Sequence, residues 1–369
     1  MPIYMDRHDV SDSVTAENVA ALHQEDLKVQ QQFGCRGLTY WFDDIRKTAF
    51  CLVEAPDKEA IIKMHNLAHG EVPHQIIEVE ASIVESFLGR IEDPDKALNT
   101  ELNIINDPAF RTIMAVAIEY QYFKNYDPFS NAEKLPHVYR QMAAIFKLFE
   151  GNVVEQNENG FLISFKSVTN AVLCALKVQD NYKIFKNQYK INFAELRIGL
   201  HAGVPVTGKK SIFEDTIKLA ARMHFVSRAE IVVSEEVRHL YESENLGNFV
   251  DTNQVYVLTS SEEKFITDFM EFTEKEWQNT GLKVNDFGKN IGISKSKLYR
   301  KMIQVTGKSP HIFLLHYRLQ KSLQQLQKQK GNISEVAFDS GFNSPSYFAK
   351  CFRKKYGIMP SALYISVHS

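Results

Sequence analysis

The sequence predicts a multidomain α+β protein in which two mixed α/β units precede an all-α region. Three observations support this organisation. About eighty residues at the front alternate short apolar strands with amphipathic helices, about ninety at the end show only helical patterns, and one helical pattern occurs twice. A chain of 369 residues is also long enough for two or three domains.

The first unit, predicted for residues 1–82, has the element order β-α-β-β-α-β. Thr15 suits the N-cap of its first helix. This order predicts a ferredoxin-like sandwich. Pairing two such units through their sheets would bury the face that the helices leave open, so we expect a homodimer. The predicted strands are 2–8, 36–43, 48–55 and 75–79, and the predicted helices are 15–33 and 58–69.

Histidines are the chemically interesting residues of this unit. His65 and His69 are four positions apart on a predicted helix, so both imidazoles project from the same face. Such a pair suits nickel, zinc or copper. Two alternatives are a structural histidine pair hydrogen-bonded by a carboxylate, and a site for a small organic molecule. The candidate metal ligands are His8, His23, His65 and His69, and the nearby carboxylates are Glu54 and Glu78.

The same unit resembles a family of small stand-alone proteins that includes a nickel-responsive member. The resemblance lies in residues 39–43 (TYWFD), residues 49–56 (AFCLVEAP) and the HxxxHG of residues 65–70, and it covers nearly all of residues 1–80. It implies binding of a divalent transition metal such as nickel, with Glu54 as a further possible ligand.

The second unit, predicted for residues 108–260 after a linker at 83–107, resembles a class III nucleotidyl cyclase domain. The resemblance implies an α/β fold that binds a nucleotide. The matching segments are residues 160–165 (GFLISF), 171–176 (AVLCAL), 196–203 (LRIGLHAG), 217–222 (IKLAAR) and 231–234 (IVVS).

This unit departs from the cyclase family at the positions that carry catalysis. Two-metal catalysis needs a pair of carboxylates, but the equivalent positions are Ala117 and Asn159. The ribose-orienting asparagine is replaced by Lys218, whereas Arg222 is retained. We therefore expect a cyclase-like domain without cyclase activity, kept for dimerisation, ligand binding or signal relay, with Arg222 as a candidate ligand contact.

An active cyclase that converts ATP or GTP is the alternative. It would need Glu119 or Glu158 to replace the missing carboxylates. Each is shifted by one or two residues from the required position, and a shift of one residue on a strand turns a side chain to the opposite face.

The doubled pattern occupies residues 284–310 and 333–360. In each copy a short amphipathic helix ends at a glycine (Gly292, Gly341), an apolar residue follows, and a polar cap (Ser294, Asn343) begins a basic helix. The glycine permits a left-handed turn, so the second helix leaves at a steep angle. This is the arrangement of a helix-turn-helix. An ordinary helical hairpin is the alternative, which the second copy disfavours.

This region, within a predicted domain at residues 261–369, resembles the DNA-binding domain of AraC/XylS-type regulators. The matching segments are residues 296–301 (SKLYRK), 306–310 (TGKSP), 317–319 (YRL), 341–348 (GFNSPSYF) and 352–357 (FRKKYG). The resemblance implies two helix-turn-helix units joined by a long helix at 310–329, and double-stranded promoter DNA as the partner.

The second helix of each unit is expected to enter a major groove. Arg300 and Asn343 can recognise guanine or adenine edges, whereas the lysines suit phosphates. The candidate DNA-contacting residues are Ser294, Lys295, Ser296, Lys297, Arg300, Asn343, Ser344, Ser346, Tyr347, Lys350 and Arg353.

Charge supports this assignment independently. Residues 275–369 contain sixteen Lys or Arg against four Asp or Glu, a net charge of +12, while residues 1–274 have a net charge of −14. A basic helical region can neutralise phosphates. The chain's total of −2 therefore hides a polarised molecule.

The remaining features indicate a cytoplasmic protein with reduced thiols. Four scattered cysteines form no CxxC pair, no cleavable leader precedes Asp6, and no apolar run is long enough to cross a membrane. The polar residues 251–280 suit a hinge. The combined expectation is a transcription regulator controlled by a metal, small-molecule or nucleotide effector, with metal sequestration as an additional role.

Overall fold

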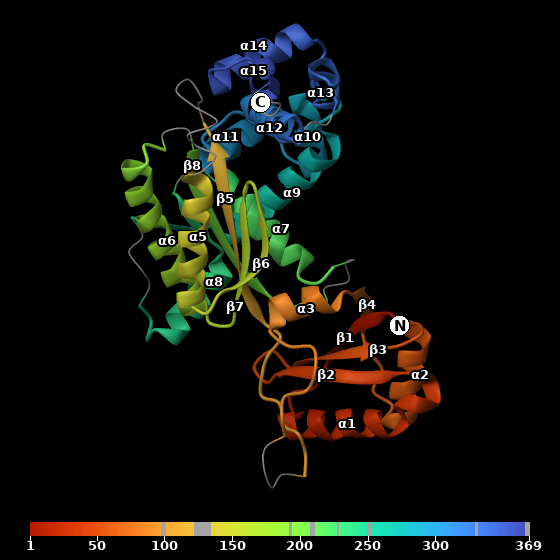
Figure 1. The fold of residues 1–369 in the computed structure, drawn as a ribbon. Coiled ribbons are helices and arrows are strands. Elements are labelled where there is room, and N and C mark those ends of the chain that lie inside the picture. Colours follow the sequence, from red (N-terminus) through yellow and green to blue (C-terminus); the bar gives the residue numbers. More distant parts are fainter. Residues whose placement is uncertain are drawn as a thin grey trace.

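The computed structural model describes residues 1–96, 101–121, 134–191, 194–206, 211–226, 229–248, 253–328 and 331–365. Two sheet-containing units and a helical unit follow one another along the molecule, with the N-terminal unit at one end and the helical unit at the other (Figure 1). The predicted multidomain α+β fold is confirmed. None of the described helices combines the length and the apolarity that crossing a membrane requires.

The N-terminal unit has the predicted β-α-β-β-α-β order. Its four strands form an antiparallel sheet in the order β2-β3-β1-β4, as expected for a ferredoxin-like sandwich. The predicted helix 15–33 divides into an α-helix capped by Thr15 and a 3-10 turn, η1. The elements are β1 (Ile3–Asp9), α1 (Ala16–Val29), η1 (Gln30–Phe33), β2 (Arg36–Asp43), β3 (Thr48–Glu54), α2 (Lys58–Ala68) and β4 (Gln75–Val79).

Both faces of this sheet are buried. Tyr40 and Cys51 face the side covered by α1 and α2, whereas Trp41 and Phe50 face the other side. That second side is covered by helix α3 (Ala81–Leu88) and by apolar residues of the middle unit such as Phe213. The face that we expected to pair between two copies is therefore covered within one chain, and this route to a homodimer is closed.

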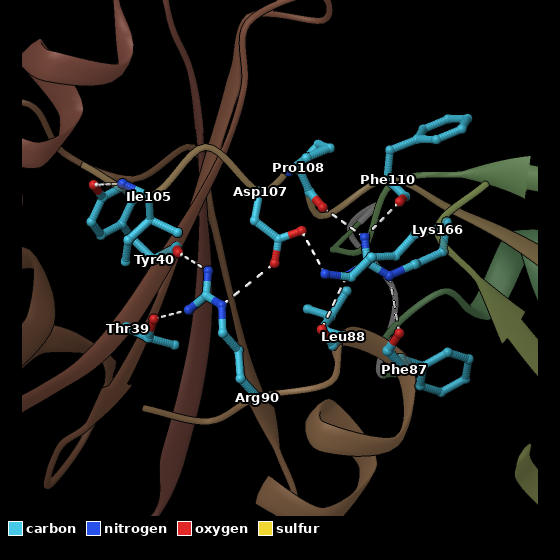
Figure 2. A network of polar contacts seen from close by, with 11 residues as sticks. Thr39, Tyr40, Phe87, Leu88, Arg90, Ile105, Asp107, Pro108, Phe110 and Lys166 are labelled. Carbon is cyan, nitrogen blue, oxygen red and sulfur yellow. Dashed lines mark hydrogen bonds and ion pairs between the residues drawn. The ribbon is translucent and has the colours of Figure 1, made fainter. Parts of the chain in front are cut away.

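The predicted linker packs against the N-terminal sheet beyond the end of α3. The guanidinium of Arg90 donates hydrogen bonds to the Thr39 hydroxyl and the Tyr40 carbonyl (Figure 2). Asp107 lies 3.5 Å from Arg90 Nε and 3.0 Å from Lys166 Nζ. This segment thus connects the two units through polar contacts. Residues 97–100 of the predicted linker lie outside the described part.

Arg111, the first residue of the middle sheet, holds the end of α3. Its side chain is 1% exposed and donates to the carbonyls of Phe87 (3.1 Å) and Leu88 (3.0 Å) (Figure 2). A further hydrogen bond reaches the Pro108 carbonyl at 2.6 Å. Burial lowers the pKa of Arg111 to about 10. The Phe87 and Leu88 carbonyls lie at the C-terminal end of α3. The buried guanidinium of Arg111 therefore satisfies acceptors that would otherwise lack partners.

The middle unit contains a six-stranded sheet in the order β10-β9-β8-β5-β7-β6. Helices α5, α6 and α8 lie on one side of it, and α7 lies on the other (Figure 1). The elements are β5 (Arg111–Tyr120), α5 (Lys134–Leu148), β6 (Asn152–Asn157), β7 (Gly160–Phe165), α6 (Val168–Gln188), β8 (Ala194–Gly203), α7 (Glu214–Arg222), η2 (Met223–Phe225), β9 (Ile231–Val233), α8 (Glu235–Glu244) and β10 (Val255–Val257).

The C-terminal unit consists of seven helices within the described residues. The long central helix begins at Pro310 as predicted and ends at Gln327, whereas the predicted last residue, Gln329, lies outside the described part. The elements are α9 (Ser260–Glu276), α10 (Val284–Ile291), α11 (Lys295–Thr306), α12 (Pro310–Gln327), α13 (Ile333–Asp339), α14 (Pro345–Tyr356) and α15 (Pro360–Ile365).

The predicted hinge at residues 251–280 is wrong over most of its length. Helix α9 fills residues 260–276 and buries Phe265 and Phe269 on one face, while its glutamates lie mostly on the other. These rings share one apolar core with Met223 of the middle unit and Phe287 of α10. The segment therefore joins two units firmly. Residues 251–252 of the predicted hinge lie outside the described part.

Candidate nucleic-acid interface and metal centre

Two helix-turn-helix units are present, α10–α11 and α13–α14. Gly292 ends α10 with φ +71°, and the Ser294 side chain caps α11 by accepting the Lys297 N–H. In the second unit Gly341 has φ +76°, and a Cβ there would lie 2.7 Å from the Trp277 carbonyl oxygen. Both predicted glycines are thus required by the turn geometry.

The cap of the second basic helix differs from the prediction. The Ser344 side chain accepts the Tyr347 N–H and begins α14, whereas we expected Asn343 to do so. Pro345 takes the first helical position, where its missing N–H costs nothing, so the cap falls on the residue before it. Asn343 is left exposed at the front of the helix.

The front turns of α11 and α14 are open to solvent. Leu298, Met302, Phe348 and Phe352 are buried beneath them, as predicted for residues that hold the helices in place, and Cys351 is half-buried. Of the predicted DNA-contacting residues, only the cap Ser344 is half-buried. The exposed ones are Ser294, Lys295, Ser296, Lys297, Arg300, Asn343, Ser346, Tyr347, Lys350 and Arg353.

The positive charges of the exposed lysines and arginines on these two helices also lack acidic partners among the described residues. Among the described residues, no carboxylate forms an ion pair with Lys295, Lys297, Arg300, Lys350 or Arg353. Unpaired cations on exposed helix ends can exchange their counterions for phosphates. The geometry therefore suits a polyanion at both helix-turn-helix units.

A second candidate site lies between α1 and α2. Asp26 Oδ1 is 3.0 Å from His65 Nδ1 and 3.1 Å from His69 Nε2, and the two nitrogens are 3.2 Å apart. Three ligands placed about 2.1 Å from one ion at right angles are about 3.0 Å apart, so this triangle fits one divalent metal ion. Asp26 Oδ1 is moreover buried without a well-oriented hydrogen-bond donor. The residues present therefore fit the metal that the sequence implied.

The histidine protons are placed by the surrounding acceptors. His65 Nε2 lies 3.2 Å from Asp6 Oδ2, and the other nitrogen of the same ring, Nδ1, faces Asp26. Because His69 Nδ1 accepts the Glu71 N–H at 3.1 Å, this ring in its neutral form carries its proton on Nε2. A metal ion would displace the proton from His65 Nδ1, and this ring would keep its Nε2 proton toward Asp6. Binding through His69 Nε2 would move the proton of that ring to Nδ1, so the Glu71 N–H would lose its acceptor.

The side chains of this site favour their ionised forms. Burial alone would lower the pKa of His65, but the neighbouring carboxylates of Asp26 and Asp6 outweigh it and raise that pKa to about 10. Burial likewise opposes ionisation of Asp6 and Asp26, yet the neighbouring histidines lower the pKa of both carboxyls. A protonated imidazole between two carboxylates keeps these side chains together without a metal.

The other predicted ligands lie outside the triangle. His8 Nε2 contacts Asp6 Oδ1 at 3.3 Å, and His23 Nε2 contacts Asp93 Oδ2 at 3.2 Å. Glu54 pairs with Arg36 on the sheet edge. Asp26 and Asp6 were not among the ligands predicted from the sequence. The spacing of three residues between His23 and Asp26 shows a shared helix face, but only the packing of α1 on α2 brings Asp26 to His65.

The triangle of Asp26, His65 and His69 opens into a cavity of about 210 Å³. Asp6, His8 and Cys51 form a second cluster, of which His8 and Cys51 line the cavity and Asp6 is fully buried. Burial raises the pKa of the Cys51 thiol well above its usual value, so this sulfur stays protonated. The triangle of Asp26, His65 and His69 is therefore the better metal site, and the cavity provides access to it.

The positions singled out by the cyclase resemblance make structural contacts in the middle unit. Ala117 on β5 pairs with Gly160, and the Asn159 carbonyl accepts the Ile118 N–H at 2.7 Å. Lys218 Nζ pairs with Glu214 on the same helix. These contacts bring no carboxylate pair to the two expected metal positions.

Arg222 connects the middle unit to α9. Its side chain is 4% exposed, and Nη2 lies 2.8 Å from Glu274 Oε2, with Nε 3.3 Å from Oε1. Glu271 lies 3.7 Å from Nη1. A ligand that used Arg222 would first have to open this two-point ion pair.

These features define a protein with a ferredoxin-like unit, a six-stranded sheet unit and a double helix-turn-helix unit. Residues 4–79 match the family model of nickel responsive protein SCO4226-like, and residues 288–364 match that of a helix-turn-helix domain. The chain thus carries a domain of the nickel-responsive kind at its N-terminal end and an AraC-type helix-turn-helix domain at its C-terminal end.

Similarity to individual proteins is confined to parts of the chain. Histidine kinase P4 of Formosa agariphila is 33% identical over 104 residues, which is 28% of this chain and 8% of that protein. The HTH-type transcriptional regulator MtrA of Neisseria gonorrhoeae is 38% identical over 68 residues, 18% of this chain and 23% of that protein. The chain therefore spans less than a quarter of either relative. An adenylate/guanylate cyclase/hydrolase from Silicibacter pomeroyi is 22% identical, with TM-score 0.31, and the match covers 37% of this chain and 81% of that one.

Proposed function

We propose that the protein is a cytoplasmic transcription regulator that binds promoter DNA through both helix-turn-helix units. The observation that carries this proposal is the pair of basic helices, α11 and α14, whose front turns are exposed and whose cations have no described acidic partner. The net charge of +12 over residues 275–369 supports it, because a polyanion is the natural partner of such a region.

Titration of the full chain with labelled genomic fragments tests this proposal. Binding to particular fragments is expected with a dissociation constant of about 10⁻⁸ M at moderate salt, and with a steep dependence on salt concentration. Random duplexes of the same length are the control. Equal affinity for random and genomic duplexes would contradict the proposal.

The N-terminal unit is proposed to bind a divalent transition metal such as nickel through Asp26, His65 and His69. The triangle of ligand atoms supports it, as does the match of residues 4–79 to the nickel-responsive family. When bound, the ion would replace the proton that holds these side chains together. Asp6 would then orient His65 from the outer side, as carboxylates behind metal-binding histidines do.

Calorimetry with Ni²⁺ and Zn²⁺ separates this site from ordinary surface histidines. His69→Ala is expected to weaken binding by about a hundredfold, because one of three ligands is lost. His74→Ala is the matched control, since His74 lines the same cavity outside the triangle. His65→Ala is less informative because it leaves Asp6 and Asp26 buried without a cation. Equal heats from wild type and His69→Ala would contradict the assignment.

Signal transfer is proposed to follow the two firm junctions. Arg111 and α3 join the N-terminal unit to the middle sheet, and α9 joins that sheet to the DNA-binding unit. A metal or ligand that changes the first unit could thus alter the placement of α11 and α14. Adding Ni²⁺ to the DNA titration measures this coupling. Unchanged affinity with metal bound would leave sequestration as the role of the N-terminal unit.

The middle unit is proposed to lack cyclase activity. Ala117 and Asn159 supply no carboxylate, and Arg222 is engaged by Glu274. The alternative, an active cyclase, is tested by incubation with ATP or GTP and Mn²⁺. Cyclic nucleotide above background that is lost in Arg222→Ala would overturn the proposal. Homodimer formation, expected for such a regulator, is tested by sedimentation of the full chain.

A further inference from the structure

A second cavity, of about 440 Å³, lies where the middle sheet meets the DNA-binding unit. The end of β5 reaches the helices of that unit (Figure 1). β5 contributes Glu119 and β8 contributes Arg197, while Lys308 precedes α12 and Lys355 belongs to α14. The remaining wall is largely apolar and comes from α12. The volume falls within the range of about 300–1,000 Å³ that is usual for small-molecule sites.

The cavity contains an excess of positive charge. Four cationic side chains, Arg197, Lys308, Lys354 and Lys355, line it together with a single carboxylate, Glu119. No ion pair joins any of these five groups to a partner among the described residues. The Arg197 Nε atom is also buried without a hydrogen-bond acceptor. Arg197, Lys308 and Lys355 are half-buried and Lys354 is exposed. Holding three half-buried cations together is costly unless an anion joins them.

Two side chains that line the cavity, Lys355 and His316, have lowered pKa values. Burial lowers the pKa of Lys355 to about 8; nearby Glu119 opposes the shift, and Lys308 adds to it. Burial lowers the pKa of His316 to about 4, and the positive charges of Lys355 and Lys308 lower it further. Burial is the main cause of both shifts, so both side chains lie in a partly enclosed space, and the positive charge of Lys308 adds to each shift.

The cavity uses a different side of the recognition helix from the predicted DNA contacts. On α14, Lys350 and Arg353 lie on one stripe, whereas Cys351 and Lys355, four residues apart, lie on the neighbouring one. The cavity takes the second stripe together with Lys354, which lies one turn after Lys350 on the first stripe. A molecule held there would touch the recognition helix without occupying its DNA-contacting side chains.

We propose that this cavity binds a small molecule carrying one or more phosphate groups, which the four cations recognise. The apolar wall from α12 would hold the less polar part of the ligand, and Glu119 would accept a hydrogen bond from one of its hydroxyl or amino groups. Because the ligand would bridge the middle sheet and α14, its binding would change the orientation of that helix toward DNA. Only this last consequence rests on the proposed DNA-binding function.

Calorimetric titration of the full chain with pyrophosphate, AMP and ATP tests the binding step. The ionic strength is kept constant, and sulfate is the control anion. At least one phosphate compound is expected to bind with a micromolar dissociation constant. Lys308→Gln and Lys355→Gln are each expected to weaken that binding about tenfold, because each removes a charge-assisted contact.

Lys275→Gln is the matched control, since it removes the same charge from an exposed position on α9, outside the cavity and outside the recognition helices. Its affinity for the phosphate compound is expected to equal that of wild type. Thermal unfolding verifies that each variant is folded. Lys308 lies in the turn before α12, so its variant remains informative if Lys355→Gln proves unstable.

Three results would overturn the inference. The first is that the folded protein binds none of the phosphate compounds. The second is that both cavity variants bind the phosphate compound as tightly as wild type. The third is that the cavity variants bind DNA more weakly while their affinity for the phosphate compound is unchanged. The third result would assign the cavity to the DNA backbone. Failure of the chain to prefer any genomic fragment would instead contradict the proposed function and leave the calorimetric result intact.

Discussion

The guanidinium of Arg318 on α12 donates a hydrogen bond to the carbonyl oxygen of Trp277 at the end of α9, with Nε and oxygen 2.7 Å apart. Its Nη2 atom reaches the Asn279 carbonyl, also at 2.7 Å. The turn at Gly341 passes directly over this contact, because a Cβ there would lie 2.9 Å from Arg318 Nε. One arginine thus joins α9, the central helix and the second helix-turn-helix.

Gly341→Ala is therefore expected to destabilise the protein by about 2–4 kcal/mol, from the positive φ and the overlap with backbone and guanidinium atoms. Urea unfolding measures the change. Gly281→Ala is the matched control, because Gly281 is exposed and its φ is not in the left-handed region. A loss of less than about 1 kcal/mol in Gly341→Ala would show that the turn can rearrange.

The buried Arg222 and its partner Glu274 should be energetically coupled. Glu274→Gln is expected to cost about 1–2 kcal/mol, less than a fully buried pair because Glu274 is 39% exposed. Arg222→Met and the double variant complete a cycle that isolates the pair. Glu271→Gln, at the more distant carboxylate, is expected to cost less. A coupling near zero would mean that this junction depends on apolar packing alone.

Lys297 should contribute to DNA affinity without affecting sequence preference. Lys297→Ala is expected to weaken binding to all duplexes alike and to reduce the slope of log K against log salt by about 1. Lys63→Ala, an exposed lysine on α2, serves as the control. A change in the ranking of DNA sequences would contradict the assignment of Lys297 to a phosphate.

Arg300 is expected to affect sequence preference. Arg300→Ala should cost about 1–3 kcal/mol on the preferred duplex and relax the choice at one base position. Competition titrations with single-base variants of that duplex measure both effects. A uniform loss on all duplexes would instead place Arg300 on the DNA backbone.

His224 should make the protein less stable in acid. Burial lowers its pKa to about 4; Glu119 opposes this shift, and Lys321 and Arg197 add to it. Below its unfolded pKa of about 6.5, the unfolded chain binds a proton that the folded chain does not, so stability falls as pH decreases toward 4. The loss at pH 5.5 is about 1 kcal/mol.

Urea unfolding between pH 7 and 5 measures this loss, and His224→Gln is expected to reduce the slope. The exposed His311 provides the control variant, whose slope should match that of wild type. An unchanged slope in His224→Gln would show that the ring is protonated in the folded protein.

The sequence predicted the N-terminal unit almost completely, because its strands have apolar runs bounded by turn residues and its helices have caps. It predicted the helix-turn-helix units because their order is repeated. It failed at α9, where the glutamates suggested a hinge although Phe265 and Phe269 repeat at helical spacing. It also failed at Asp26, since a contact between two helices depends on packing that neither helix encodes alone.

The shared core of α9, the middle unit and the first helix-turn-helix determines how the chain can be dissected. A fragment cut just before α10 would keep every residue proposed to contact DNA but would expose the ring of Phe287, which now stacks on Phe269 with ring centroids 4.9 Å apart. Leu319 and Leu323 of α12 would likewise lose the sheet against which they pack. Such a fragment would be prone to aggregate, so a soluble excised module would have to retain α9 and replace the apolar side chains that the missing sheet had covered.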